Sequence, residues 1–199
     1  MSKTFDFVVA GAGVVGIHVA RQLLQQHAAC RIALVDRALA AGSQASTTNS
    51  GVLHAGVYYG SDSHKAAFCV RGNASMKAFC RRANVPLLEC GKLIVLTCPS
   101  RAHHVPTILR RAADAGAVQH DISKQVRLRL QPSNNQRCFI LLMSVQEALQ
   151  LEPLVNPDAQ RYLWAPSSSV AVPSSYFAAL LRDTVEMAGE RLKKLHLVV

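Results

Sequence analysis

The amino-acid sequence predicts an α/β fold that opens with a parallel βαβ unit. The first strand, Phe5–Ala10, is mostly apolar, which is typical of a buried strand in a parallel sheet. The segment Val14–His27 carries apolar residues such as Val15 and Val19 at helical spacing. A second apolar strand, Arg31–Asp36, follows. A strand, a helix and a strand in this order indicate a Rossmann-like unit.

The rest of the chain gives a coarser pattern. A polar loop over 40–50 precedes a glycine-punctuated segment over 51–60. Further elements are expected in this order: a helix over Ser63–Arg82, a strand over Lys92–Thr97, a helix over Arg101–Ala115, a helix over Ser174–Ala188 and a strand over Leu195–Val199. Alternation of Val126, Leu128 and Leu130 with arginines predicts one more strand.

Length and composition exclude several classes of protein. With 199 residues, 50% of them hydrophobic, the chain can bury a core and is not predicted to be disordered. Because no uncharged run approaches the ~20 residues of a membrane-spanning helix, no transmembrane segment is expected. Asp6 and the following glycines interrupt any export signal, so a secreted protein is not predicted. Six cysteines without a C-x-x-C pair predict reduced thiols and no metal site.

The net charge of +10 is spread over the chain, with an excess of +6 in residues 1–100 and +4 in residues 101–199. No basic tail or aromatic RNA-binding motif accompanies this charge, so no nucleic-acid partner is predicted. A dispersed positive charge is equally suited to small anionic ligands.

A G-x-G-x-x-G motif lies between the first strand and the first helix. Gly11 allows the tight turn, Gly13 lets the backbone approach a pyrophosphate, and Gly16 lets helix and strand pack closely. Asp36, twenty residues after Gly16, can accept hydrogen bonds from ribose hydroxyls. Arg37 beside it leaves NADP(H) open, and FAD and NAD(H) share the fingerprint. The motif therefore predicts a dinucleotide site.

The string Asn49–Tyr59, reading N-S-G-V-L-H-A-G-V-Y-Y, narrows this choice. Together with the glycine motif it resembles the FAD-dependent L-2-hydroxyglutarate dehydrogenases, within the D-amino-acid-oxidase-like flavoprotein group. Lys65–Gly72 and Cys90–Val95 carry further matches, and Leu151–Pro153 a looser one. The likeness covers residues 5–115 well and 145–192 moderately, whereas residues 119–143 depart from the family.

The resemblance implies an FAD-binding domain interleaved with a substrate domain built on an antiparallel sheet. The corresponding division is 1–85 for the FAD-binding part, 86–170 for a partial substrate domain and 171–199 for a return to the FAD-binding part. The implied reaction is oxidation of L-2-hydroxyglutarate, or a related 2-hydroxy acid, to the 2-oxo acid, with electrons passing through FAD to an acceptor. The family is mitochondrial in eukaryotes and in bacteria cytoplasmic or peripherally bound to the inner membrane.

His54 is the candidate catalytic base, because an imidazole titrates near neutral pH and lies here in the glycine-flanked loop expected to approach the flavin. The alternative is that His54 only hydrogen-bonds the cofactor or backbone. Asn49, Ser50 and Gly51 are expected cofactor contacts, although Asn49 and Ser50 are equally suited to a turn in which they bond their own backbone.

A dicarboxylate substrate requires cationic partners, for which Lys65, Arg71 and Lys92 are available. The family pattern continues for about as many residues again, so we expect this chain to be a truncated form. Two other functions therefore stay open: a non-catalytic nucleotide-binding fragment and an NAD(P)-dependent Rossmann reductase.

Overall fold

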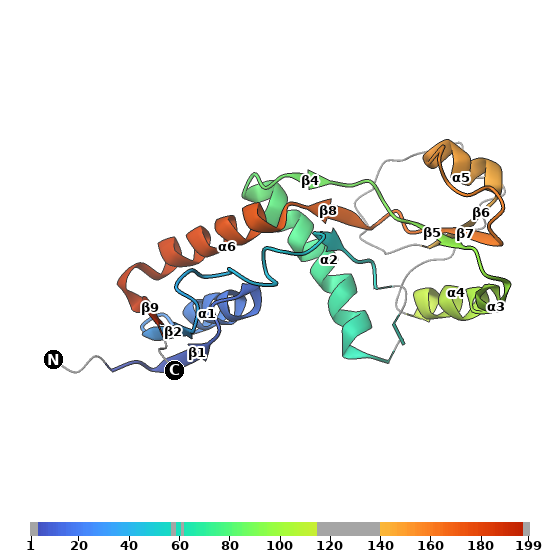
Figure 1. Cartoon of the computed structure of the whole chain (residues 1–199). Coiled ribbons are helices and arrows are strands. Elements are labelled where there is room, and N and C mark those ends of the chain that lie inside the picture. The colour runs from blue at the N-terminus through green and yellow to red at the C-terminus, as the bar shows by residue number, and fades with distance from the viewer. Residues whose placement is uncertain (1–3, 57–58, 61, 115–139, 197–199) are drawn as a thin grey trace. The chain divides into compact units, whose positions relative to one another are not determined.

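The computed structural model describes residues 4–56, 59–60, 62–114 and 140–196, and the chain divides into two compact units (Figure 1). Unit 1 comprises Met1–Gly51, Ala83–Pro86 and Val172–Val199, and unit 2 comprises Val52–Arg82 and Leu87–Ala171. Both units are therefore assembled from segments that are separate in the sequence. The expected three-part division at residues 85 and 170 stays a prediction.

Unit 1 is built on a parallel sheet of three strands in the order β1-β2-β9, as far as the described residues extend. Its elements are β1 (Phe7–Ala10), α1 (Val14–Gln26), β2 (Ile32–Asp36), α6 (Pro173–Ala188), a 3₁₀ turn η2 (Gly189–Arg191) and β9 (Leu192–His196). The central strand β2 contributes the buried residues Ile32, Ala33 and Leu34. The predicted α/β fold with an opening βαβ unit is confirmed.

Helix α1 begins directly after Gly13 and buries Ile17, Ala20 and Leu24. The valines that mark the helix in the sequence lie on its other side, since Val15 is 73% exposed and Val19 is 45% exposed. The helix therefore has apolar residues on two faces, and periodicity alone could not tell which of them is buried.

The C-terminal segment of unit 1 returns to the parallel sheet. Helix α6 has a proline in its first turn, where the missing amide N–H costs no hydrogen bond. Gly189 at its C-terminal end has φ +53°, a conformation that favours glycine. Strand β9 then begins at Leu192, three residues before the expected Leu195, and pairs with β2 over five residues. Residues 197–199 of the predicted strand lie outside the described residues.

Unit 2 contains two antiparallel sheets of three strands each within its described residues, β3-β8-β4 and β5-β7-β6. Its strands are β3 (Val52–Leu53), β4 (Leu87–Leu88), β5 (Leu93–Leu96), β6 (Leu141–Met143), β7 (Arg161–Trp164) and β8 (Ser169–Ala171). Its helices are α2 (His64–Arg82), α3 (Pro99–Ala102), α4 (Val105–Asp114) and α5 (Val145–Leu151). Antiparallel sheets in this part of the chain agree with the implied fold.

The expected single helix over Arg101–Ala115 is wrong, because the structure has two helices, α3 and α4, separated by a turn at residues 103–104. Pro106 explains the break: proline has no amide N–H, and its ring clashes with the carbonyl group four residues earlier in a continuous helix. As the second residue of α4, within the first turn of that helix, the same proline is tolerated. The strand predicted around Val126–Leu130 lies outside the described residues.

Candidate functional site

The glycine motif forms the turn between β1 and α1 in unit 1. Gly11 has φ +105°, in the region that favours glycine, and its N–H donates to the Val35 carbonyl at 2.7 Å. A Cβ atom at Gly16 would lie 1.8 Å from the Gly11 carbonyl oxygen. The backbone at Gly16 therefore packs directly against the Gly11 carbonyl group, and only glycine fits at position 16.

Gly13 precedes the first residue of α1, a helix whose first turn has no acidic residue and whose N-cap has no side-chain hydrogen bond. The amide groups at such a helix N-terminus favour a bound anion. A Cβ atom at Gly13 would lie 2.9 Å from the Ser46 Oγ, so glycine at this position leaves room for that hydroxyl group. The start of α1 is the part of unit 1 that would hold a pyrophosphate group.

Asp36 at the end of β2 is held beside the glycine turn. Its Oδ2 accepts a hydrogen bond from the Ala12 N–H at 2.6 Å, and its Oδ1 accepts one from the Ala38 N–H at 2.7 Å. A carboxylate has about four acceptor sites, and these two bonds fix its position beside the glycine turn. Arg37 next to it is exposed and has interactions of its own.

Ser46 is a residue that the sequence did not single out. Its Oγ accepts a hydrogen bond from the Val14 N–H at 2.9 Å, which ties the loop after β2 to the first turn of α1. Serine in a loop rich in Ser, Thr and Asn gives no distinctive signal, because these residues are common in any turn. Only the fold shows that this hydroxyl lies against the glycine turn.

Asn49 has its side chain engaged within its own turn. Its Nδ2 donates to the Ala45 and Ser46 carbonyls at 2.9 and 3.3 Å, and its Oδ1 accepts from the Gly51 N–H at 2.9 Å. Such bonds are expected if Asn49 forms a turn by hydrogen-bonding to the backbone of its own loop. Ser50 is exposed beside it, and Gly51 has φ +68°. Cofactor contacts by these three residues stay a prediction.

In unit 2, His54 follows β3 and is exposed. Partial desolvation lowers the pKa of its imidazole, and the positive charges of Lys92 and Lys65 lower the pKa further. Both effects disfavour the imidazolium form, so the neutral ring, which can accept a proton, persists to lower pH than in an ordinary histidine. Lys65 also lies over the Tyr59 ring, with its Nζ 4.5 Å from the ring centroid.

Asn73 holds the backbone that carries His54. It is a buried residue of α2, 7% exposed, and its Nδ2 donates to the Leu53 carbonyl at 3.0 Å and to the His54 carbonyl at 3.4 Å. A third bond reaches the Ser167 carbonyl at 3.1 Å. One amide group thus joins the β3 loop to the segment before β8. The signal in the sequence was an asparagine within a predicted helix, where this residue is a poor helix former.

The described part of the chain contains no group of three or more His, Cys, Asp and Glu side chains placed to hold a metal ion. None of its helices combines the length and the apolar character that crossing a membrane requires.

Comparison with protein families assigns the chain. The sequence profile of the family described as FAD dependent oxidoreductase matches residues 6–194. The chain belongs to this family. FAD, rather than NAD(P)H, is therefore its cofactor, and the residues around the glycine turn of unit 1 fit the pyrophosphate and ribose of such a dinucleotide.

Curated relatives of this FAD-dependent family carry a more specific name. L-2-hydroxyglutarate dehydrogenase of Escherichia coli K12 is 38% identical over 112 residues, which span 56% of this chain and 26% of that protein. The mitochondrial L-2-hydroxyglutarate dehydrogenase of Arabidopsis thaliana is 30% identical over 181 residues, 91% of this chain and 32% of that protein. The chain therefore spans well under half the length of these relatives.

Solved structures with a similar fold include two oxidases. L-α-glycerophosphate oxidase from Mycoplasma pneumoniae with FAD bound matches with a TM-score of 0.76 at 21% identity, over 98% of this chain and 45% of that one. Glycine oxidase from Geobacillus kaustophilus matches with a TM-score of 0.73 at 18% identity, over 96% of this chain and 46% of that one. At these identities the likeness supports the fold alone.

Proposed function

We propose that the chain forms part of an FAD-dependent dehydrogenase that oxidises L-2-hydroxyglutarate to 2-oxoglutarate. The observation that carries the proposal is the alignment with relatives named L-2-hydroxyglutarate dehydrogenase, 38% identical over 112 residues in the E. coli protein. The string Asn49–Tyr59, through which the sequence resembles this group, supports the same substrate.

In this proposal His54 takes the proton of the substrate hydroxyl group on a ring nitrogen. The chemistry that bound FAD would supply is an acceptor for the hydride on C2 of the substrate, while the O–H electron pair forms the C=O bond. The lowered pKa of His54 supports its role, because a base must be unprotonated at the pH at which the enzyme works. Asn73 is a positioning residue in this scheme, since it holds the His54 carbonyl.

Lys65 and Lys92 are the proposed partners of the substrate carboxylates. Both raise the positive potential at His54, which supports their placement near an anionic substrate. The charges that lower the pKa of His54 are those of Lys92 and Lys65 and do not include Arg71. We therefore favour the two lysines over Arg71.

Electrons are proposed to leave through FAD to an acceptor, and peripheral membrane association stays a prediction. The relatives from Dictyostelium discoideum and Arabidopsis thaliana are named mitochondrial, and others are bacterial. By this likeness we propose a mitochondrial location if the protein is eukaryotic, and otherwise a cytoplasmic location or one at the inner membrane surface.

A second candidate is a nucleotide-binding chain without catalysis, one of the functions that the sequence leaves open. The chain spans 26% of the E. coli relative and 45% of the M. pneumoniae oxidase. Such a chain would bind FAD through unit 1 and would not oxidise a 2-hydroxy acid.

One experiment separates the two candidates. The purified chain is loaded with FAD and mixed anaerobically with L-2-hydroxyglutarate, D-2-hydroxyglutarate, glycerol 3-phosphate or glycine while flavin absorbance and reduction of an artificial dye are followed. The dehydrogenase proposal expects bleaching with L-2-hydroxyglutarate, and a rate at least 100-fold lower in His54→Gln, because general base catalysis contributes about 10²–10⁴-fold. Bound FAD that none of these compounds reduces supports the non-catalytic candidate, and reduction by glycine or glycerol 3-phosphate in preference contradicts the proposed substrate.

A further inference from the structure

Unit 2 contains a pocket whose lining residues have no role in the proposed function. It lies beside the end of β5 and helices α3 and α4 and has a volume of about 380 Å³. Six residues line it: Leu96, Arg101, His104, Thr107, Ile108 and Arg111. None of them belongs to the predicted cofactor contacts, to the proposed base or to the proposed substrate lysines.

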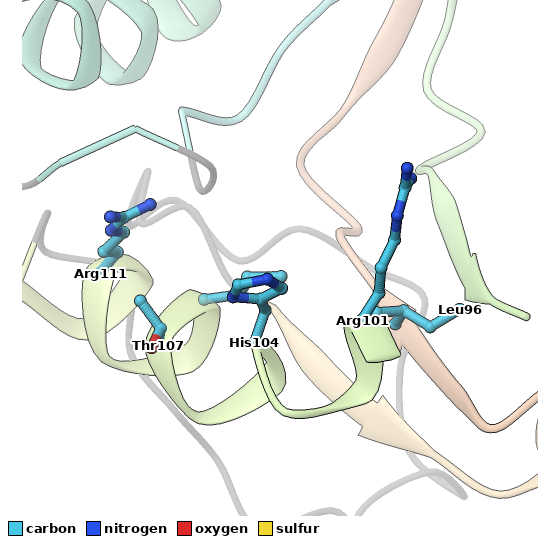
Figure 2. Close-up of a pocket in the computed structure, with 6 residues that line it drawn as sticks. Leu96, Arg101, His104, Thr107 and Arg111 are labelled. Atoms are coloured by element: carbon cyan, nitrogen blue, oxygen red, sulfur yellow. The ribbon is translucent and has the colours of Figure 1, made fainter. Parts of the chain in front are cut away.

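Four of the six lining residues carry a polar group, and the other two are apolar. Arg101, His104 and Arg111 supply basic groups, Thr107 supplies a hydroxyl, and none of the six residues is acidic. Residues four positions apart lie on one face of a helix, which brings Thr107 and Arg111 to the same side of α4. His104 directly precedes this helix, and its carbonyl accepts a hydrogen bond from the Ile108 N–H at 2.9 Å. Figure 2 shows the side chains of Arg101, His104 and Arg111 extending to the same side of the two helices.

The apolar residues that line the pocket also pack against the core of unit 2. Leu96 and Ile108 are partly buried and pack against a hydrophobic cluster of unit 2. The buried members of that cluster are Ala55, Val105, Ile140, Leu163 and Ala165. Val105 and Leu109 direct the apolar face of α4 into this cluster. Ile108 lies between this face and the basic residues, because it both packs against the cluster and lines the pocket.

Three other cations in the described part of the chain form ion pairs with carboxylates. Arg21 pairs with Asp183 at 2.8 Å in unit 1, and in unit 2 both Lys77 and Arg81 pair with Glu89. Arg101 has no carboxylate or aromatic partner among the described residues.

We propose that this pocket is a second ligand site, which binds a small soluble organic anion with two or more carboxylate or phosphate groups. The guanidinium of Arg101 offers paired N–H donors that match either group, and the Thr107 hydroxyl adds a further donor. The spread of basic groups along α3 and α4 suits negative charges at separate ends of the ligand, with its carbon skeleton over Leu96 and Ile108. The site is built from side chains of unit 2 and does not depend on the proposed dehydrogenase activity.

The chain offers a closely matched pair of double variants to test the site. Arg101→Gln/His104→Gln removes two groups that line the pocket. Arg110→Gln/His103→Gln removes the same two residue types from the same segment, at exposed positions outside the pocket lining. Both double variants also lose the contact between the His103 and His104 rings, whose centroids are 4.0 Å apart. They therefore differ mainly in whether the lost groups line the pocket.

Binding is measured by isothermal titration calorimetry with citrate and with pyrophosphate, and by the rise in Tm that each compound causes. The expected result is saturable binding by the unaltered chain, weakened about tenfold in Arg101→Gln/His104→Gln, which corresponds to about 1.4 kcal/mol. The control double variant is expected to stay within about twofold, as surface charges outside the site contribute little. Circular dichroism checks that both variants fold, and the Tm of each without ligand gives a second check.

Three results would overturn the proposal. Equal weakening in both double variants would mean a diffuse positive surface instead of a site. No saturable binding of either anion by the folded chain would mean that the pocket takes no such ligand. Binding to vesicles that contain phosphatidylglycerol, but neither to phosphatidylcholine vesicles nor to citrate or pyrophosphate, would assign these cations to a membrane surface.

Discussion

The two units present groups for anions in different ways. In unit 1 the glycine turn and the start of α1 offer backbone amides, with Gly16 packed so closely that a Cβ atom would lie 1.8 Å from the Gly11 carbonyl oxygen. In unit 2 the positive groups are the ends of long side chains, such as Lys65 near His54 and Arg101 in the pocket beside α4. A backbone site is fixed by the fold itself, whereas a side-chain site depends on which residues the fold gathers.

This difference predicts different sensitivities to mutation. A change in the glycine turn must alter both folding and cofactor binding in unit 1, because the same atoms serve both. Replacement of a lysine or arginine side chain in unit 2 is expected to alter the local charge and the titration of nearby groups, with little loss of stability. The variants below test this contrast in order of the expected effect.

The largest effect is expected for Gly16→Ala. Because the new methyl group overlaps the Gly11 carbonyl, the free energy of unfolding should fall by about 3 kcal/mol and FAD binding should be lost. Gly72→Ala is the control: a Cβ atom there meets nothing within 4 Å, and the residue lies within α2. Alanine at position 72 should raise stability by about 0.5–1 kcal/mol. Urea denaturation measures both, and equal effects at the two glycines would contradict the close packing of the turn.

The next effect is expected for Asn73→Ala in unit 2. The change leaves the Leu53, His54 and Ser167 carbonyls without their shared donor, and Asn73 is 7% exposed, so unfolding should become easier by about 2 kcal/mol. Asn73→Asp keeps the size of the side chain but removes the donors, so it should be at least as destabilising. Chemical denaturation gives the values. If Asn73→Asp were as stable as the unaltered chain, these bonds would not hold the loop.

The same contrast decides how much of the structure could be predicted from the sequence. The turn at Gly11–Gly16 and Asp36 were predictable, because a backbone site imposes a fixed spacing of glycines on the sequence. Asn73 and the pocket beside α4 were not, since their partners are distant in the sequence and meet only through the antiparallel sheets. Pro106 is a signal in the sequence for the break between α3 and α4, but the helical spacing of the residues around it predicts one continuous helix.

A moderate effect is expected for Asp36→Asn. This residue accepts bonds from the Ala12 and Ala38 N–H groups, and loss of its charge should weaken FAD binding about tenfold. Asp6→Asn is a matched control, because Asp6 accepts the Arg31 N–H at 2.7 Å and precedes β1, whereas Asp36 ends β2. The control should lose a similar small amount of stability and keep its FAD affinity. Fluorescence titration with FAD measures both, and equal losses of affinity would remove Asp36 from the cofactor site.

The smallest effect is expected at the lysines near His54. Lys92→Gln and Lys65→Gln each remove a positive charge that disfavours the imidazolium, so the pKa of His54 should rise in each variant. NMR titration of the imidazole protons measures this shift without any need for activity. In an active enzyme the acid limb of the kcat/KM profile should move to higher pH. Lys77→Gln, which removes a lysine paired with Glu89, should leave the His54 titration unchanged. A fall in the pKa of His54 on removing Lys92 would contradict the arrangement.

The most direct test of the account is an equilibrium titration of the purified chain with FAD, made in parallel on the unaltered chain and Gly16→Ala. Membership of the FAD-dependent family and the geometry of the glycine turn predict saturable binding of one FAD per chain, abolished in the variant. A folded, unaltered chain that does not bind FAD, or a Gly16→Ala variant that binds it equally well, would contradict the placement of the cofactor at this turn.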